Sequence, residues 1–581
     1  MAERGLRIAS GVAAAGVTLG VAEVVSVLIS PDSSPLQAVG AWVIDHTPDT
    51  VRERVIETVG TDDKLLLFIS MGIVTVLVAG LAGFAERIRR PVGSIAFAVF
   101  GLLSLLAAVG RPEAGWTWAL PSLLGAWAGI AVLRNLIRRV EEFAAASAEL
   151  VSKEAAAEAL TKISATGGAV APVGPATDLR GIGPAAGESA GADDISPDAA
   201  ANTAVAAGSV PGGAGRSAAD DSGFEPALQR RQVVRGIVIA AAAGIGAGVV
   251  GRVLGLRSHN VSSERAEVQL PSPAGPVPVV DPAADLKIPG LTPYLTSNAG
   301  FYRIDTALTV PQVSKDSWSL RIHGMVDREI RLTYADLAAR KAVEKLVTLT
   351  CVSNPVGGDL IGNASWLGYR LDELLTEAGP HPDADMALST SVDGFTAGSP
   401  LAALMDGRDA LLAVGMNGEP LPTAHGYPVR LVVPGLYGYV SATKWVTDIE
   451  ITRFDRAQAY WTKRGWSQDG PIKTGTRIDT PTASSLAPGR VTVAGVAWAQ
   501  HRGIEAVEVR IDNGAWQPAR LAAEPSIDTW RQWAFDWQAT SGLHTVWARA
   551  TDGSGVVQTS DVAYPVPDGA TGYPSISVRI G

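Results

Sequence analysis

The residue with the most distinctive chemistry in this sequence is Cys351, the only cysteine among 581 residues. A single cysteine excludes an internal disulfide, and it cannot build a cysteine-rich zinc or iron–sulfur site. Its thiolate could still ligate a soft metal if the other donors came from elsewhere. Its thiol could equally pack as a small apolar residue, which is the favoured interpretation for a cysteine without context. The surrounding motifs therefore decide between the two.

A second unusual residue is Arg430, which lies inside the apolar run YPVRLVVPG (427–435). A buried arginine is costly unless its charge is paired. The partner could be a nearby carboxylate, such as Asp448 or Glu450, or it could be a bound anion. The sequence leaves both possibilities open.

Short strands and helices must position these residues. We expect LVTLTC (346–351) to form a strand that ends at Cys351, and the run around Arg430 to form a second strand. KWVTDIEITRF (444–454) predicts a third strand, and LGYRLDELLTEAG (367–379) predicts a helix that Gly379 terminates. Together these elements predict a mixed α+β domain.

The C-terminal part of the chain alternates apolar and polar residues in short runs separated by turns. The runs are RVTVAGVAWA, IEAVEVRIDNG, WRQWAFDWQA and LHTVWARATDG. Asp512-Asn513-Gly514 is typical of a hairpin turn. This spacing predicts a β-sandwich of immunoglobulin type that lacks the disulfide.

The N-terminal part of the chain is strongly apolar. Five segments approach the roughly 20 residues that a helix needs to cross a bilayer, at 7–29, 65–85, 92–110, 115–135 and 233–255. The first contains Glu23, so an amphipathic helix on the membrane surface is its alternative. Arginines at 87–90, 134–139 and 230–235 fall on one side if the N-terminus is cytoplasmic. Everything after the fifth segment is then extracytoplasmic.

These patterns give the domain organisation. We expect four transmembrane helices in 1–139, a disordered cytoplasmic linker in 140–229, a fifth transmembrane helix in 230–256, an extracytoplasmic linker in 257–292, the α+β domain in 293–484 and the sandwich in 485–581. The cytoplasmic linker begins with a short helical stretch and is otherwise too poor in apolar residues to fold. Arg230-Arg231 is similar to a twin-arginine export signal, with simple positive-inside charge as the alternative.

Several functions are disfavoured by composition. None of the five apolar segments contains a histidine, so we expect no haem between the helices and favour anchoring over electron transfer. These segments hold few ionisable residues and no obvious inverted repeat, which argues against a transporter. The net charge of −10 argues against a nucleic-acid partner.

The order of motifs in residues 290–581 resembles the sulfite oxidase family of molybdopterin-dependent oxidoreductases. The motifs are NAGFYRIDTAL (298–308), LTCVSN (349–354), TSVDGFT (390–396), HGYPVRLVVPGLYGYVSATKW (425–445) and YWTKRGW (460–466). The resemblance implies a multi-domain fold, with N-terminal transmembrane α-helices, an α+β molybdopterin-binding domain of sulfite oxidase type and a C-terminal immunoglobulin-like β-sandwich. The sandwich is similar to the family's dimerisation domain, which implies a homodimer.

The resemblance also implies roles for particular residues. Cys351 would be the catalytic metal ligand, which gives its thiolate to molybdenum while the pterin dithiolene supplies two more sulfurs. The residues implied to contact the molybdopterin-type molybdenum cofactor are Asn298, Phe301, Tyr302, Thr390, His425, Arg430, Thr443 and Lys444.

Two departures separate this chain from the sulfite oxidases proper. Aligned on Val310-Pro311, Asp305 stands where they carry an arginine for the substrate oxyanion, and Arg303 lies two residues away. Trp466 stands where they carry an active-site tyrosine. A carboxylate near the metal is expected to repel a small anion, so the substrate and the direction of catalysis remain open.

These inferences predict a membrane-anchored extracytoplasmic enzyme that performs two-electron or oxygen-atom transfer on a small-molecule substrate. Its expected partners are the lipid bilayer and a separate electron-transfer protein. The alternative is a cofactor-free membrane-anchored surface protein that binds partners through its β-sandwich.

Overall fold

The computed structural model describes residues 2–48, 51, 63–111, 114–166, 224–258, 260–483 and 485–581. Its contacts divide the chain into two compact units. The first consists of Met1–Val17, Val76–Phe97 and Ala128–Gly244, and the second of Thr18–Thr75, Ala98–Trp127 and Ile245–Gly581.

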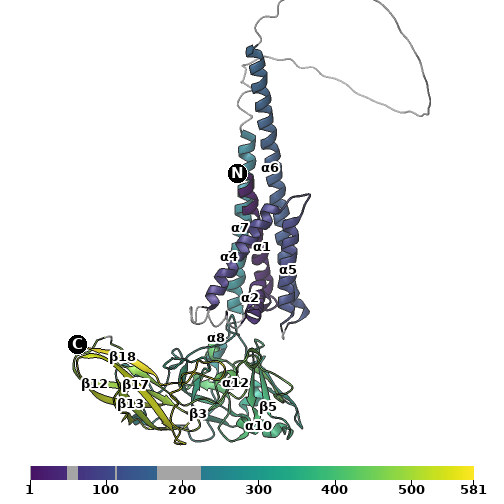
Figure 1. The fold of residues 1–581 in the computed structure, drawn as a ribbon. Coiled ribbons are helices and arrows are strands. Elements are labelled where there is room, and N and C mark those ends of the chain that lie inside the picture. The colour runs from purple at the N-terminus through teal and green to yellow at the C-terminus, as the bar shows by residue number, and fades with distance from the viewer. Residues whose placement is uncertain are drawn as a thin grey trace, which may run out of the picture. The chain divides into compact units, whose positions relative to one another are not determined.

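The N-terminal part of the chain is helical (Figure 1). The helices are α1 (Ala2–Val27), α2 (Pro35–His46), α4 (Asp63–Ala85), α5 (Val92–Val109), α6 (Leu120–Thr166), α7 (Phe224–Ser258) and the short α8 (Ser262–Glu267). Five stretches are long and apolar enough to cross a membrane: Glu3–Val27, Lys64–Ala85, Val92–Val109, Trp116–Lys162 and Gln229–Gly255. They overlap the five predicted segments, and the fourth continues past residue 135 to Lys162. The polar Glu23 of the first accepts a hydrogen bond from Ser34 Oγ at 2.5 Å.

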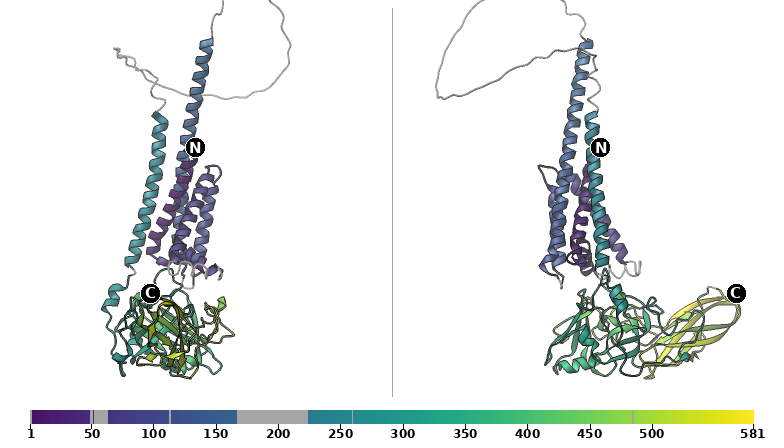
Figure 2. Two further views of the ribbon diagram at one scale, coloured as in Figure 1. Left: turned by 60° about the vertical axis from the view of Figure 1, so that its left-hand side comes forward. Right: turned by 180° about the vertical axis from the view of Figure 1, so that it is seen from behind.

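Two helices differ from the expected organisation. Helix α6 continues unbroken to Thr166, so the helical stretch predicted after residue 140 is an extension of the fourth apolar helix (Figure 2). Residues 141–166 contain no glycine or proline and are rich in strong helix formers. Helix α2 lies between the first and second of the five predicted apolar segments. The rest of the predicted disordered linker, at 167–223, lies outside the described residues.

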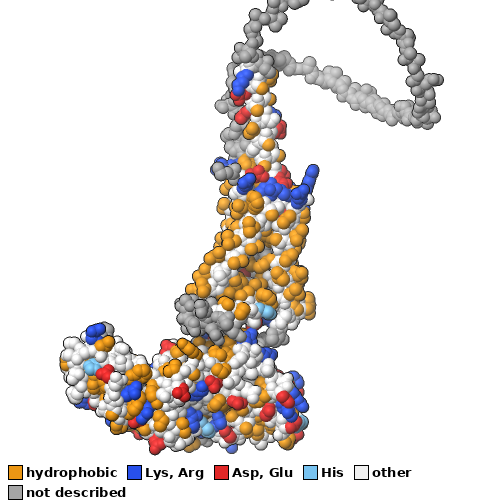
Figure 3. Space-filling view, viewed as in Figure 1, with side chains coloured by type: hydrophobic (Ala, Val, Ile, Leu, Met, Phe, Trp, Pro, Cys, Tyr) orange, Lys and Arg blue, Asp and Glu red, His pale blue; other side chains and the backbone are white. Residues whose placement is uncertain are grey.

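Several polar side chains within the first unit are paired. Arg7 donates to Glu86 O at 2.9 Å and lies 3.5 Å from Glu141 Oε1. The carboxylate of Glu86 in turn accepts hydrogen bonds from Ser94 N and Oγ. Figure 3 shows basic side chains beside the orange apolar surface of the helices. The exposed arginines of this unit include Arg89, Arg90, Arg138 and Arg139. Such arginine clusters are typical of the cytoplasmic ends of membrane helices.

The α+β part of the second unit contains two β-sheets. The first has the order β2-β1-β10-β5-β6, with β1 (Ser319–Gly324), β2 (Ile330–Thr333), β5 (Met386–Ser391), β6 (Thr396–Pro400) and β10 (Val446–Thr452). The second has the order β3-β4-β7-β8, with β3 (Ala342–Thr350), β4 (Ile361–Arg370), β7 (Leu411–Met416) and β8 (Glu419–Pro420), and β9 (Arg430–Val432) pairs with β7. Every residue of β7 is buried.

Short helices accompany these sheets: α9 (Tyr334–Ala338), α10 (Leu371–Ala378), α11 (Leu401–Met405) and α12 (Gly438–Ser441). Helix α10 buries Leu371, Leu374, Leu375 and Ala378, which is the spacing of one helical face. It ends at Gly379, whose φ of 67° favours glycine.

Three expected elements are shorter than predicted, one of which is the strand expected at 444–454, observed as Val446–Thr452. Residues 367–370 are the end of β4 rather than the start of a helix, because Gly368 lets β4 approach β7 closely. A Cβ at Gly368 would lie 2.4 Å from Leu412 O. Only Arg430–Val432 of the run 427–435 is a strand, since Pro428 and Pro434 have no N–H to donate to a sheet.

The C-terminal part of the second unit is a β-sandwich (Figure 1). One sheet has the order β11-β12-β16-β15, with β11 (Gly475–Thr480), β12 (Gly489–Trp498), β15 (Arg520–Leu521) and β16 (Arg531–Ala539). The other has the order β14-β13-β17-β18, with β13 (Ile504–Ile511), β14 (Gln517–Pro518), β17 (Gly542–Asp552) and β18 (Ser575–Ile580).

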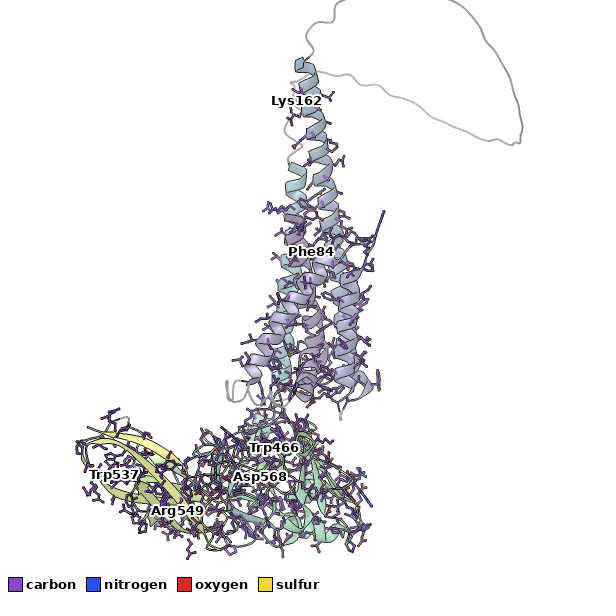
Figure 4. The ribbon with its side chains drawn as sticks, in the orientation of Figure 1. Phe84, Lys162, Trp466, Trp537, Arg549 and Asp568 are labelled. Carbon is purple, nitrogen blue, oxygen red and sulfur yellow. The ribbon has the colours of Figure 1, made fainter. Side chains whose placement is uncertain are left out.

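The core of the sandwich takes residues from both sheets. Val493 and Trp533 come from one sheet and Val509 and Val546 from the other. Trp537 and Arg549, on β16 and β17, are labelled in Figure 4. The predicted strands at 489–498, 504–511, 531–539 and 542–552 are all present. Strand β11 extends the sandwich to before residue 485.

Candidate functional site

Cys351 is held at the end of β3 by a tight return loop. Its N–H donates to Leu360 O at 2.9 Å, and its carbonyl accepts from Asn354 N at 3.1 Å. The Asn354 side chain closes the loop by accepting from Leu360 N at 3.0 Å. Cys351 Sγ lies 3.0 Å from Ser353 Oγ, and the residue is only 9% exposed. Burial raises the pKa of the thiol. The loop thus places one thiol on a fixed backbone.

An aromatic cluster lies around the segment 298–302. The rings of Phe301 and Tyr302 stack at 5.3 Å, and Phe301 contacts the rings of Trp366 and His425 edge-on. Burial raises the pKa of Tyr302 well above its usual range, so its hydroxyl stays protonated. Asn298 is tied to this cluster, because its carbonyl oxygen lies 3.1 Å from His425 Nε2.

Arg430 is a buried cation, 5% exposed, on strand β9. Its guanidinium donates to three backbone carbonyls: Leu431 O at 3.3 Å, His425 O at 3.0 Å and Ala442 O at 3.4 Å. Burial lowers its pKa to about 10. Burial also lowers the pKa of His425 to about 4, with a smaller contribution from Arg430, so this imidazole is neutral at neutral pH.

Neither Asp448 nor Glu450, the carboxylates that could have paired with Arg430, forms an ion pair with it. Asp448 lies 3.0 Å from His323 Nε2 instead. Within the described part of the chain no carboxylate pairs with Arg430. A guanidinium that is buried among neutral carbonyls is well suited to an anion such as the phosphate of the cofactor.

Lys444 approaches Arg430 across a glycine. A Cβ at Gly426, whose φ is 111°, would lie 2.9 Å from Arg430 Cβ and 3.2 Å from Lys444 Cβ. Lys444 Nζ donates to Asp305 Oδ2 at 2.8 Å and to Ala424 O at 3.2 Å. Burial lowers the pKa of Lys444 to about 8, although the ion pair with Asp305 opposes that change.

Asp305 is the centre of a cationic cluster. Besides Lys444, Arg303 Nε contacts Asp305 Oδ2 at 2.7 Å and Lys64 Nζ contacts Oδ1 at 2.9 Å. The Asp305 side chain is only 4% exposed, and these cations hold its pKa well below the usual range despite burial. The carboxylate is therefore neutralised by its neighbours. This corrects the expectation that it would repel a small anion.

A cavity of about 1410 Å³ within the second unit connects these groups. Of the candidate residues, it is lined by Phe301, Tyr302, Cys351, His425, Arg430 and Lys444. Asn298 lies behind this lining, in contact with His425. Trp466 also lines the cavity and is packed against Tyr439 and Trp461 (Figure 4).

Besides Asn298, two candidate residues are not in the cavity wall. Thr443 is fully buried, and its Oγ1 lies 2.7 Å from Ser389 Oγ. Thr390 is on β5 and is paired with Asp448 of β10, while its neighbour Ser391 lines the cavity. Their contact with a cofactor stays a prediction.

Sequence reasoning missed Lys64 and Ser353. Lys64 is 241 residues from Asp305 in the chain, and no local pattern links them. Ser353 lies within the motif LTCVSN, so its proximity to Cys351 could have been noticed from the spacing alone.

Comparison with known proteins identifies the catalytic part. Residues 307–461 match the family model described as oxidoreductase molybdopterin binding domain. Human mitochondrial sulfite oxidase is 28% identical over 321 residues, which cover 46% of this chain and 58% of that protein. The uncharacterised oxidoreductase YuiH of Bacillus subtilis is 31% identical over 153 residues, which cover 26% of this chain and 74% of that protein.

Among solved structures, the sulfane dehydrogenase SoxCD of Paracoccus pantotrophus is similar. The match has 23% identity and a TM-score of 0.44, and covers 50% of this chain and 82% of that one.

These sequence matches define a molybdopterin-binding oxidoreductase domain. The chain belongs to the sulfite oxidase family of molybdopterin-dependent oxidoreductases. It is therefore an enzyme with a molybdenum–molybdopterin cofactor, and not the cofactor-free binding protein that we considered as an alternative. The chain spans just over half the length of human sulfite oxidase.

Proposed function

We propose that this chain is a membrane-anchored enzyme whose catalytic domain lies on the extracytoplasmic side. It transfers an oxygen atom, or two electrons, to or from a small substrate. The observation that carries this proposal is that Cys351, Tyr302, Arg430 and Lys444 converge on one cavity although they come from separate segments of the chain.

Each residue has a role that follows from its surroundings. Arg430 and Lys444 are buried cations that can hold the cofactor's phosphate, and Cys351 can give a thiolate to the metal. Phe301 and His425 form a wall against which a flat pterin can lie. Asn298, Thr390 and Thr443 would complete these contacts. When bound, the cofactor supplies a metal that accepts or donates two electrons.

The protonation states of the polar groups constrain what they do. His425 is neutral at neutral pH, and its Nε2 lies 3.1 Å from the Asn298 carbonyl. Nε2 therefore carries the proton, and Nδ1 is left as a hydrogen-bond acceptor. Tyr302 keeps its proton because of burial, so it can donate a hydrogen bond but cannot act as a base.

Membrane attachment is supported by the five long apolar helices and the arginine clusters at their ends. The absence of histidine from the predicted apolar segments supports an anchor without haem, so electrons would pass to a separate partner protein. Arg230-Arg231 at the start of the fifth segment would suit export of a folded, cofactor-loaded domain. The sandwich is of immunoglobulin type and would mediate a homodimer.

The test is metal and pterin analysis of the full chain purified from cells that make the cofactor. We expect stoichiometric molybdenum and pterin, and we expect Cys351→Ser to lose turnover while it keeps its fold and its pterin. Circular dichroism and pterin fluorescence are the controls. Cofactor-free wild-type protein, or unchanged turnover in Cys351→Ser, would contradict the proposal.

A further inference from the structure

We propose that the cavity admits an uncharged molecule with an apolar body, and that helices α2 and α4 supply the wall against which this body lies. The inference rests on the proposed function, because it concerns the substrate of the same site. It adds a class of ligand, namely small molecules that partition into a membrane.

The first argument is size. Ligand pockets usually have volumes of roughly 300–1,000 Å³. The cavity here has about 1410 Å³, and Cys351, Arg430 and Lys444 account for only part of its wall. Space therefore remains beyond the region that these residues assign to the cofactor.

The second argument is charge. Among the residues that the structure describes, four cationic and three carboxylate side chains line the cavity: Lys64, Arg303, Arg430 and Lys444 against Asp305, Asp359 and Asp393. A phosphate group carries between one and two negative charges at neutral pH. The cofactor would therefore remove the small cationic excess, and little net charge would remain to attract an anionic substrate.

The third argument is the chemistry of the remaining wall. Two further groups line it, and both are largely apolar. One consists of Val43 and Ile44 of α2, Leu66 and Leu67 of α4, and Val51 between these helices. The other consists of aromatic residues, namely Phe395, Tyr460, Trp461, Trp466 and Tyr564. An apolar wall of this kind favours an apolar ligand, because each buried methylene contributes to binding.

Polar contacts fix these helices to the site. Lys64 Nζ of α4 contacts Asp305, and Tyr460 Oη donates to Asp45 Oδ1 of α2 at 3.3 Å. Arg464 also donates to Asp45 O at 3.3 Å. The helices are thus bound to the same two segments, 301–308 and 460–466, that line the cavity.

The experiment is photolabelling of the full, cofactor-loaded chain in lipid nanodiscs. The probe is a methyl alkyl sulfoxide with a diazirine at the end of its chain, because this compound is uncharged and carries a transferable oxygen. We expect the label within residues 43–47 of α2 and its C-terminal end, or within residues 64–70 of α4. We also expect unlabelled long-chain sulfoxide, but not dimethyl sulfoxide, to displace it. Lengthening the competitor should improve displacement by roughly fourfold per methylene until the cavity is filled.

Matched variants distinguish labelling inside the cavity from labelling by probe in the surrounding lipid. Leu67→Trp and Val43→Phe fill the cavity and should lower the displaceable labelling by roughly fivefold or more. Leu65→Trp changes a neighbouring residue that is 60% exposed and does not line the cavity, so its labelling should match wild type.

Two outcomes would overturn the inference. They are labelling that no competitor displaces, and equal loss in Leu67→Trp and Leu65→Trp. Molybdenum content is measured in the same samples. Low molybdenum in wild type would contradict the proposed function, whereas normal molybdenum without displaceable labelling would contradict only the apolar ligand.

Discussion

Replacing Arg430 by methionine tests the site most sharply, because its expected effects on the cofactor-free and the cofactor-loaded protein differ. Without cofactor, the variant loses three hydrogen bonds to carbonyl oxygens, each worth about 1 kcal/mol. It also removes a charge whose burial lowers the pKa of the guanidinium to about 10, a cost of roughly 3 kcal/mol. The two contributions offset each other. The cofactor-free variant should therefore unfold within a few degrees of wild type.

With cofactor, the balance changes. Truncating one partner of a buried charge pair costs roughly 2–5 kcal/mol, which weakens binding by about 30-fold to several thousandfold. The wild-type chain should therefore gain much more thermal stability from the cofactor than Arg430→Met gains. Arg430→Lys keeps the charge but loses the planar fork, so it should retain an intermediate amount of cofactor.

The assay uses the full chain in detergent, produced in cells with and without cofactor synthesis. Tryptophan fluorescence follows unfolding, and pterin retained after gel filtration measures binding. If Arg430→Met is strongly destabilised without cofactor and yet retains pterin like wild type, the arginine is structural and the assignment of an anion to it is wrong.

The remaining predictions concern charge. Asp305→Asn should strengthen phosphate binding by roughly tenfold or more, since Lys444 loses its counter-ion; unchanged affinity by calorimetry would contradict this. In the sandwich, the Asp512 carboxylate accepts from His544 Nδ1 and raises the histidine's pKa. Because the folded pKa is the higher one, this stabilisation is complete below about pH 6.5 and disappears as pH rises through the folded pKa. Asp512→Asn should remove this pH dependence of the midpoint of thermal unfolding, whereas Asp536→Asn should retain it.

The parts of the structure that could be predicted depend on local pattern. The strands of the sandwich follow from alternation, because one face of each strand is buried. Cys351 at a strand end and Arg430 as a buried cation follow from single residues that are unusual in their surroundings. The extension of α6 to Thr166 follows from composition, since nothing in 141–166 terminates a helix.

The parts that could not be predicted depend on contacts between distant segments. From the sequence we expected the Asp305 carboxylate to repel anions. That expectation was wrong because a sequence does not show which cations will surround a carboxylate. Lys64 could not be assigned to the site for the same reason. The end of β4 at Arg370 was mistaken for helix because 367–379 has helical periodicity, and only the approach of β7 at Gly368 settles the boundary.

The contact between Lys64 and Asp305 indicates that the apolar helices contribute to the candidate site as well as to membrane attachment. An anchor alone could be removed without effect on the site. Here α4 supplies one of three cations around Asp305, and the same carboxylate holds Lys444 in place. Removing the helices would leave Asp305 with one cation fewer and would remove Leu66 and Leu67 from the cavity wall. A truncated catalytic domain should therefore bind ligands differently from the whole chain, so substrate screens on the truncated form would miss apolar compounds.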